Sequence, residues 1–285
     1  MIPQISESTY TLLDSGNFRK LEQVGSYCLE RPSPQAVWLP SQNEKVWHQK
    51  YAWFERNMTG GGKWCFSQAL PKSWLIDFDS LRLKIQPTGF GHFGLFPEQK
   101  DNCSMIRKQI QKSSQPLEVL NLFAYTGIST LAAAQAGATV CHVDAAKGVV
   151  DWARENAALS ALENKPIRWI VDDAQQFLKR EIKRGKTYDA VILDPPSFGR
   201  GPDKELWNIE KHLTSFLALL KKIFSNNFKF FIFSGHSEGY TPLALQNLLK
   251  DILPEGHFEC GEMTTQEFFA KRPLPSGAFC RWTHQ

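Results

Sequence analysis

The chain has 285 residues, of which 42% are hydrophobic and 22% charged, with a formal net charge of +4. This composition is typical of a globular protein that needs no disulfide framework, and the length suffices for one large domain or two modest ones. The small positive charge permits a nucleic-acid partner without requiring one.

The six cysteines are spread along the chain without a CxxC pair or zinc-finger spacing. We therefore predict free thiols in a reducing compartment and no metal site. The first ten residues lack the basic start and apolar run of a signal peptide. The most apolar stretch, residues 120–140, is interrupted by polar residues and is not a membrane span. We expect a cytoplasmic protein that does not contact a membrane.

The first 95 residues hold five of the nine tryptophans, short apolar runs and frequent Pro and Gly. Residues 37–39, 74–76 and 81–85 are typical of short strands, and the last run alternates with period two, as a half-exposed strand does. We predict a small β-rich domain over residues 1–95, which is a candidate substrate reader.

Residues 96–285 are predicted to form a second domain, beginning with a helix over residues 102–112. From about residue 117 onward, strands and helices alternate. Strands are expected at 117–122, 138–143, 167–171, 188–193 and 228–233, helices at 128–136, 147–160, 174–184, 209–224 and 243–253, and two last strands at 257–263 and 278–282. This alternation predicts an α/β fold with a doubly wound, mostly parallel, seven-stranded Rossmann-like sheet.

Sheets of this kind bind ligands at the carboxyl ends of their strands. After the first strand, residues 121–127 (NLFAYTG) form a turn with a single glycine, whereas a dinucleotide site usually has three. A nucleoside cofactor without phosphates, such as S-adenosylmethionine, does not need the other two. The alternative is an ordinary turn between a strand and a helix.

Acidic residues follow the next two strands. Asp144 is placed to accept hydrogen bonds from both ribose hydroxyls of a nucleoside. Asp172 or Asp173 is placed to bind an adenine amino group, and we favour Asp173. At both positions the alternative role is that of a helix N-cap, because Asp is a preferred capping residue.

The strongest motif is DPPSF (194–198), directly after the fourth strand. Two consecutive prolines fix φ and remove two N–H donors. The turn is therefore stiff, and its carbonyls and the Asp194 carboxylate are candidate acceptors for the hydrogens of a substrate nitrogen. Phe198 offers a flat face on which a base can stack, and Arg200 or Lys204 is placed to contact phosphate. The alternatives are a rigid turn and a solvated loop.

Several stretches together resemble the S-adenosylmethionine-dependent methyltransferases related to the large-subunit ribosomal RNA methyltransferase I family. They are LNLFAYTG (120–127), HVDAAKGVVDWARENAALS (142–160), DDA (172–174), LDPPSFGRG (193–201), GLFPEQ (94–99) and LPSGAFCRW (274–282). The resemblance implies S-adenosyl-L-methionine as the cofactor, S-adenosyl-L-homocysteine as the product and an RNA base, in ribosomal RNA first of all, as the substrate.

The resemblance also implies cofactor-binding residues, with Glu98 and Gln99 closing the cofactor pocket, and catalytic residues. The candidates for substrate binding rest instead on their own places after the fourth and fifth strands. The cofactor-binding residues are Glu98, Gln99, Asn121, Phe123, Ala124, Tyr125, Thr126, Gly127, Asp144, Ala145, Asp173, Ala174 and Asp194. The catalytic residues are Asp194, Pro195, Pro196 and Phe198. The substrate-binding residues are Ser197, Arg200 and His236.

The chain departs from the cytosine-C5 enzymes of this group at one place. Those enzymes use a thiol that adds to the base, because a ring carbon must first be made nucleophilic. The matching strand end here reads FSGHS (233–237) and has no cysteine. Transfer to a nitrogen needs only positioning and a lone pair, so we predict a nitrogen acceptor. His236 is then a candidate for removing a proton, or else a polar residue at the sheet edge.

Three other functions stay open at this stage. The acceptor could be a protein or a small molecule, and the chain could be a non-catalytic module that binds a nucleoside. A dehydrogenase is disfavoured because the glycines of a dinucleotide site are missing.

Overall fold

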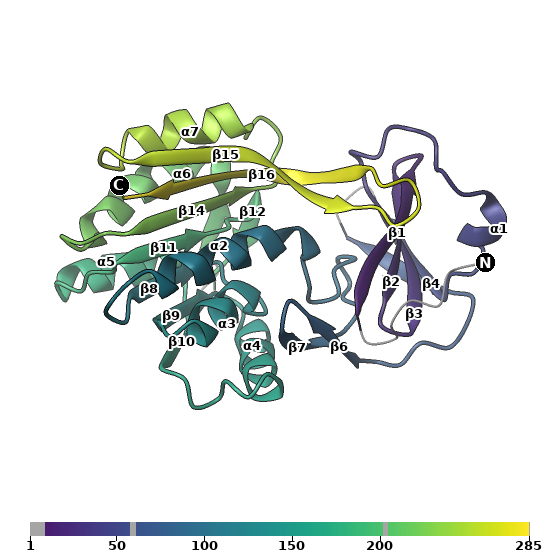
Figure 1. The fold of residues 1–285 in the computed structure, drawn as a ribbon, viewed down its shortest axis with the longest axis horizontal. Helices are drawn as coiled ribbons and strands as arrows, with labels where there is room; N and C mark the ends of the chain where they lie inside the picture. Colours follow the sequence, from purple (N-terminus) through teal and green to yellow (C-terminus); the bar gives the residue numbers. More distant parts are fainter. Residues whose placement is uncertain (1–8, 58–60, 202–204, 285) are drawn as a thin grey trace. The chain divides into compact units, whose positions relative to one another are not determined.

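The structure, a computed structural model, describes residues 9–57, 61–201 and 205–284 (Figure 1). The chain divides into two compact units, residues 1–98 with 264–276 and residues 99–263 with 277–285. The chain thus leaves the second unit after Met263 and rejoins it at Gly277. Residues 264–276 group with the first unit, although the sequence-based boundary assigned them to the second domain. The division into domains at residues 1–95 and 96–285 stays a prediction.

The first unit is β-rich, as predicted. It holds a five-stranded sheet in the order β1-β2-β3-β4-β5 and a two-stranded sheet of β6 and β7. The elements are β1 (Tyr10–Gly16), β2 (Arg19–Val24), β3 (Tyr27–Pro32), α1 (Glu44–Trp47), β4 (Ala52–Arg56), β5 (Gly62–Phe66), β6 (Trp74–Phe78) and β7 (Leu81–Ile85). The strands expected at 74–76 and 81–85 are therefore present.

The strand expected at residues 37–39 is absent, and the segment is a loop. Its backbone is held by a turn instead of by a neighbouring strand, because the Trp38 carbonyl accepts the N–H of Asn17 at 2.7 Å. The indole of Trp38 also donates to the Ser15 carbonyl at 3.0 Å. Trp38 therefore anchors a loop, although the apolar run at residues 37–39 resembles a strand in the sequence.

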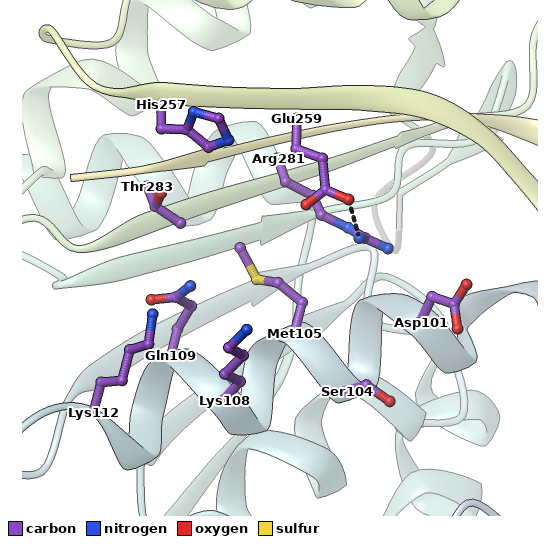
Figure 2. Close-up of a pocket in the computed structure, with 10 residues that line it drawn as sticks. All are labelled: Asp101, Ser104, Met105, Lys108, Gln109, Lys112, His257, Glu259, Arg281 and Thr283. Carbon is purple, nitrogen blue, oxygen red and sulfur yellow. Dashed lines mark hydrogen bonds and ion pairs between the residues drawn. The ribbon is translucent and has the colours of Figure 1, made fainter. Parts of the chain in front are cut away.

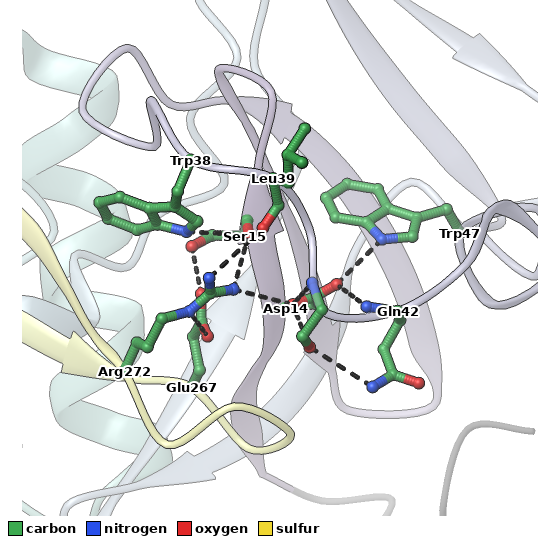
Figure 3. A network of polar contacts seen from close by, with 9 residues as sticks. Asp14, Ser15, Trp38, Leu39, Gln42, Trp47, Glu267 and Arg272 are labelled. Atoms are coloured by element: carbon green, nitrogen blue, oxygen red, sulfur yellow. Dashed lines mark hydrogen bonds and ion pairs between the residues drawn. The ribbon is translucent and has the colours of Figure 1, made fainter.

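Buried carboxylates hold this loop in place (Figure 3). Asp14 is fully buried and accepts hydrogen bonds from the Gln42 N–H at 2.9 Å and the Trp47 indole at 3.1 Å. Glu267, also fully buried, pairs with Arg272 at 3.0 Å. Buried charges are tolerated when they are paired and hydrogen-bonded in this way.

The second unit contains the predicted seven-stranded sheet, in the order β10-β9-β8-β11-β14-β16-β15. The strands are β8 (Glu118–Leu122), β9 (Thr139–Asp144), β10 (Ile167–Val171), β11 (Ala190–Leu193), β14 (Phe230–Gly235), β15 (His257–Gln266) and β16 (Pro273–Thr283). The first five strands of this order are parallel, and β16 is antiparallel to β14. The predicted α/β, mostly parallel Rossmann-like fold is confirmed.

Helices cover both faces of this sheet (Figure 1). They are α2 (Lys100–Gln111), α3 (Ile128–Gln135), α4 (Lys147–Leu159), α5 (Ala174–Lys183), α6 (Ile209–Leu220), η2 (Lys221–Ile223) and α7 (Pro242–Lys250). Buried residues of α2 and α3 pack on one face of the sheet, and those of α5, α6 and α7 on the other. All residues of β11 and β14 are therefore buried, and up to Phe233 of β14 they are apolar, as expected for central parallel strands.

One prediction from composition is wrong. Cys260 and Cys280 form a disulfide between β15 and β16, so the six cysteines are not all free thiols. Scattered spacing gave no sign of this bond, because it joins strands that become neighbours only in the folded sheet. In the described part of the chain, no helix is both long and apolar enough to cross a membrane.

Candidate functional site

The carboxyl ends of five parallel strands meet at one edge of the second unit's sheet. Register pairs join Leu122 to Val143, Leu122 to Leu193, and Leu193 to Phe233. The residues that follow these strands are the ones that the sequence analysis selected. Their side chains are therefore brought together by the topology of the sheet.

The turn after β8 has an unusual backbone. Phe123 (φ 56°), Tyr125 (φ 50°) and Gly127 (φ 91°) all adopt left-handed conformations. For residues with a side chain this costs about 1–2 kcal/mol each. A Cβ on Gly127 would also lie 3.1 Å from the Cβ of Ala153, so the turn lies close against α4. Strained backbone of this kind concentrates at ligand sites.

Asp144, the last residue of β9, ties this turn to the neighbouring strand. Its Oδ2 accepts the Tyr125 N–H at 2.9 Å and its Oδ1 accepts the Ala146 N–H at 3.0 Å. The N-cap of α4 is Ala146, so Asp144 does not have the capping role considered as its alternative. Burial raises the pKa of Asp144, and backbone hydrogen bonds, including that from Ala146, oppose the rise. Each oxygen keeps a lone pair with which it can accept a further hydrogen bond.

Sequence reasoning missed an apolar surface beside Asp144. Val171, the last residue of β10, is 42% exposed and pairs in register with Asp144. An exposed apolar side chain next to a carboxylate fits the base and the ribose of a nucleoside, since the base needs a flat apolar contact and the ribose an acceptor. The available signal was its position at the carboxyl end of a strand.

The two acidic residues after β10 both have local partners. Asp172 forms an ion pair with Arg180. Asp173 is the N-cap of α5, and its Oδ1 accepts the Gln176 N–H at 2.9 Å. The capping role that the sequence allowed for Asp173 is thus observed, and Ala174 is the buried first residue of that helix. Contact of Asp173 with adenine stays a prediction.

Asn121 lies beneath the turn. Its side chain is 2% exposed and donates to the Thr130 hydroxyl at 2.9 Å. The same hydroxyl lies 2.9 Å from Nδ1 of His142, which is fully buried. This buried chain of polar groups supports the strands under the turn, and a cofactor-binding role for Asn121 stays a prediction.

Asp194 follows β11 and is held from two sides. Its Oδ2 accepts the Nε2–H of Gln99 at 2.9 Å, and its Oδ1 lies 3.2 Å from Nε2 of His236, which follows β14. A Cβ on Gly277 would lie 2.9 Å from Nδ1 of His236, so the glycine of β16 permits this close approach. Three of the predicted site residues thus form one hydrogen-bonded group.

The diproline turn differs in one respect from its prediction. The Pro196 carbonyl accepts the indole N–H of Trp207 at 2.7 Å, so this carbonyl holds the turn and already has a donor. The ring of Trp207 lies 4.9 Å from that of Phe123 and 5.3 Å from that of Phe216. Trp207 therefore joins the turn after β11 to the turn after β8. Sequence analysis missed it, because it lies beyond the motif.

The residues after the prolines form a small hairpin of β12 (Phe198–Arg200) and β13 (Leu206–Asn208). Phe198 is 57% exposed and Arg200 is also exposed, on the same face because they are two residues apart. The Ser197 hydroxyl lies 2.6 Å from that of Ser237, beyond the end of β14. Lys204 lies outside the described residues.

Glu98 and Gln99 fall in different units. Glu98 belongs to the first unit, where it lines a pocket of about 110 Å³ together with Lys20 and Arg31. Gln99 begins the second unit and contacts Asp194. A role of either residue in closing a cofactor pocket stays a prediction. A separate groove of about 490 Å³ lies between α2 and the β15/β16 strands, and none of the residues that follow the five parallel strands lines it (Figure 2).

Comparison with known proteins identifies the family and the fold of this chain. A family model described as S-adenosylmethionine-dependent methyltransferase matches residues 15–217. The crystal structure of an S-adenosylmethionine-dependent methyltransferase from Agrobacterium tumefaciens is 37% identical, covers 100% of this chain and 95% of its own, and has a TM-score of 0.91. The crystal structure of SMU.776 in complex with S-adenosylhomocysteine is 18% identical, and the match covers 98% of this chain and 76% of that one. Its TM-score is 0.72, and at this identity the likeness shows a shared fold alone.

The name of one curated relative specifies the substrate of that protein, but the match covers less of this chain. The ribosomal RNA large subunit methyltransferase K/L from Alteromonas mediterranea is 32% identical over 192 residues, which is 64% of this chain and 26% of that protein. The chain therefore spans about a quarter of the length of that relative. The narrower resemblance to the methyltransferase I family stays a prediction.

Proposed function

This chain belongs to the S-adenosylmethionine-dependent methyltransferases, and we propose that it methylates a nitrogen of a base in ribosomal RNA. The observation that carries the proposal is the Asp194 carboxylate, which lies at the strand edge within 3.2 Å of His236 and close in sequence to the exposed ring of Phe198. A hydrogen-bond acceptor and a stacking face can position a base nitrogen, and a proton-accepting side chain can take up the proton that it loses.

In the proposed function, the turns that follow β8 and β9 bind the cofactor. S-adenosylmethionine supplies, when bound, a methyl group on a positively charged sulfur. Asp144 would accept the hydrogens of the ribose hydroxyls, and Val171 would contact the base. The turn from Phe123 to Gly127 would hold the methionine end. The donor set fits a nucleoside without phosphates, since the turn has one glycine and the carboxylate is fixed by backbone N–H groups.

The acceptor side uses Asp194 and His236. Asp194 accepts an N–H of the substrate and so turns the nitrogen lone pair toward the methyl group. The N–CH₃ bond forms as the S–CH₃ bond breaks, and the surplus proton on nitrogen passes to His236 or Asp194. Attack by a thiol is disfavoured, because Ser234 occupies the relevant strand end and Cys280 is bonded to Cys260.

Ribosomal RNA is supported as substrate by three observations. The curated relative is named for it, the chain is mildly basic, and Phe198 and Arg200 present an aromatic face and a cation together. Aromatic rings and arginines are the usual contacts for unstacked RNA bases and for phosphates. A ribosomal RNA substrate would place the protein in the cytoplasm.

The substrate proposal is tested with tritiated S-adenosylmethionine and total RNA from cells that lack the protein. We expect label in ribosomal RNA, and nucleoside mass spectrometry should find it in an N-methylated base. RNA from cells that contain the protein is the matched control and should accept little label, because its target is already methylated. Label confined to protein would favour a protein acceptor, and no label in any pool would favour a non-catalytic module.

A second prediction concerns pH and the cofactor. The ionised carboxylate of Asp144 is the form that accepts two hydroxyl hydrogens, and burial raises its pKa. Protonation therefore begins at a higher pH than for an ordinary aspartate, and affinity for S-adenosylhomocysteine should fall as the solution becomes mildly acidic. Titration calorimetry across this range measures the effect. Asp144→Asn should bind roughly tenfold or more weakly at neutral pH and lose this pH dependence. If the affinity for S-adenosylhomocysteine fell equally with pH in wild type and in Asp144→Asn, the role of Asp144 would be contradicted.

A further inference from the structure

We propose that Gln99, Asn102 and Arg281 are positioning residues that fix the orientation of the Asp194 carboxylate. This inference rests on the proposed function, because it assigns to Asp194 the task of orienting the acceptor. The three side chains form a continuous hydrogen-bonded path inside the second unit. It joins the methyl-transfer edge to the groove between α2 and the β15/β16 strands.

The path is buried for most of its length. The exposed fractions are 5% for Gln99, 1% for Asn102 and 8% for Arg281. Polar side chains that are buried to this degree need hydrogen-bond partners, because an unpaired buried polar group is destabilising. Each of these residues has a hydrogen-bond partner within the path.

The distances define the direction of each bond. Nε of Arg281 donates to Oδ1 of Asn102 at 2.8 Å. Nδ2 of Asn102 donates to Oε1 of Gln99 at 2.7 Å, and Nε2 of Gln99 donates to Oδ2 of Asp194 at 2.9 Å. The hydroxyl of Ser234 lies between the two amides, accepting from Gln99 at 3.1 Å and from Asn102 at 3.2 Å.

Arg281 sets the polarity of the whole path. A guanidinium can only donate, so Asn102 must turn its oxygen toward Arg281 and its NH₂ toward Gln99. Gln99 must then turn its oxygen toward Asn102 and its NH₂ toward Asp194. A carboxylate with one oxygen held in this way has its other oxygen in a fixed place, 3.2 Å from His236.

The outer end of the path lies in the groove. There Nη1 of Arg281 pairs with Glu259 at 3.1 Å (Figure 2). The guanidinium also lies 4.0 Å from the centre of the Phe279 ring. The ion pair and the ring hold Arg281 from outside while Nε reaches inward. The arginine is thus fixed independently of Asp194, as a residue that sets orientation must be.

Asn102→Asp tests the polarity directly. The replacement keeps the size of the side chain and the acceptor toward Arg281, but it removes the donor toward Gln99. Gln99 then turns its NH₂ toward the new carboxylate and its oxygen toward Asp194, which repels it. We expect kcat to fall roughly 10²-fold, as for misplacement of a reacting group, with little change in KM for RNA or in Kd for S-adenosylhomocysteine. Gln111→Glu, the same change at an exposed position of α2, is the matched control and should keep the wild-type kcat.

A change in kcat alone separates positioning from a purely structural role, which would also weaken cofactor binding. Retained binding of S-adenosylhomocysteine shows that the variant is folded. A kcat for Asn102→Asp equal to that of Gln111→Glu would overturn the inference, as would a rise in KM or Kd that accounts for the whole loss of activity.

A second readout does not depend on activity. In protein with isotope-labelled glutamine, the side-chain NH₂ signals of Gln99 are identified by their loss in Gln99→Leu. We expect both Asp194→Asn and Asn102→Asp to shift them, since each alters a partner of that amide. If wild-type protein methylates no acceptor, the proposed function fails, and this measurement alone decides the inference. Unshifted signals in both variants would overturn it.

Discussion

Asp194→Ala should lower kcat for methyl transfer by about 10²–10⁴-fold, the range that a positioned acid or base contributes, and leave the affinity for S-adenosylhomocysteine nearly unchanged. The physical reason is that the carboxylate, which lies 3.2 Å from His236, would contact the acceptor nitrogen in the proposed mechanism, whereas Asp144 and the turn after β8 are the proposed cofactor contacts. Tritium transfer to RNA under saturating cofactor measures kcat, and calorimetry measures the affinity.

Two further variants sharpen this prediction. Asp194→Asn keeps the shape of the side chain but replaces one acceptor oxygen with a donor, so it should lose nearly as much activity as Asp194→Ala. Asp151→Asn removes the same charge from an exposed position on α4 and should leave kcat at the wild-type value. A kcat for Asp194→Ala close to that of Asp151→Asn would show that the carboxylate takes no part in the reaction.

The fold of the second unit could be predicted because its signals are local. Apolar runs such as 190–193 and helices that begin at a capping residue depend on residues close in sequence. Asp144 and Asp194 could then be identified as candidate site residues from their places at the strand ends, since parallel strands in a βα alternation place their carboxyl ends at one edge. The edge was thus predictable without knowledge of any long-range contact.

The first unit was harder, because its strands carry buried charges. Glu22 in β2 is fully buried and pairs with Arg31 of β3, with Nε to Oε2 at 2.6 Å. The neighbouring Arg31 guanidinium and Lys20 hold the pKa of Glu22 down at about 2, although burial by itself would raise it. A sequence pattern treats Glu and Arg as surface residues, so a strand that buries such a pair loses its alternation of apolar and polar positions.

The contacts that complete the site were hidden for a different reason. Gln99 and Asp194 are far apart in sequence, and Trp207 reaches Pro196 only after the β12–β13 hairpin forms. A hydrogen bond between distant segments depends on the tertiary fold and has no local pattern. Gln99 and Asp194 were therefore both named as site residues from the sequence, but the hydrogen bond between them was not predicted, and Trp207 was missed.

The buried imidazole of His142 should make the second unit sensitive to acid. Burial lowers the pKa of His142 from an ordinary 6.5 to about 3. In the unfolded chain the imidazole takes up a proton as pH falls below 6.5, whereas in the folded unit it stays neutral until about pH 3. The lowered pKa of His142 therefore does not affect the free energy of unfolding above pH 6.5. Below that value, the free energy of unfolding decreases as the pH falls toward 3.

Between pH 7 and pH 4 this group should remove about 3 kcal/mol from the free energy of unfolding. His142→Gln keeps a polar group near Thr130 but cannot take up a proton. The variant should be less stable than wild type at pH 7, because it loses the contact of the ring with Trp169, and should regain about 3 kcal/mol relative to wild type at pH 4. Urea denaturation followed by circular dichroism measures both proteins at each pH, with His257→Gln as the control for loss of an exposed imidazole. A constant difference in the free energy of unfolding between His142→Gln and wild type across this range would show that the imidazole is protonated in the folded unit at pH 4. Since His142 lies next to Gly127, it would also show that water reaches the turn after β8 from within the unit.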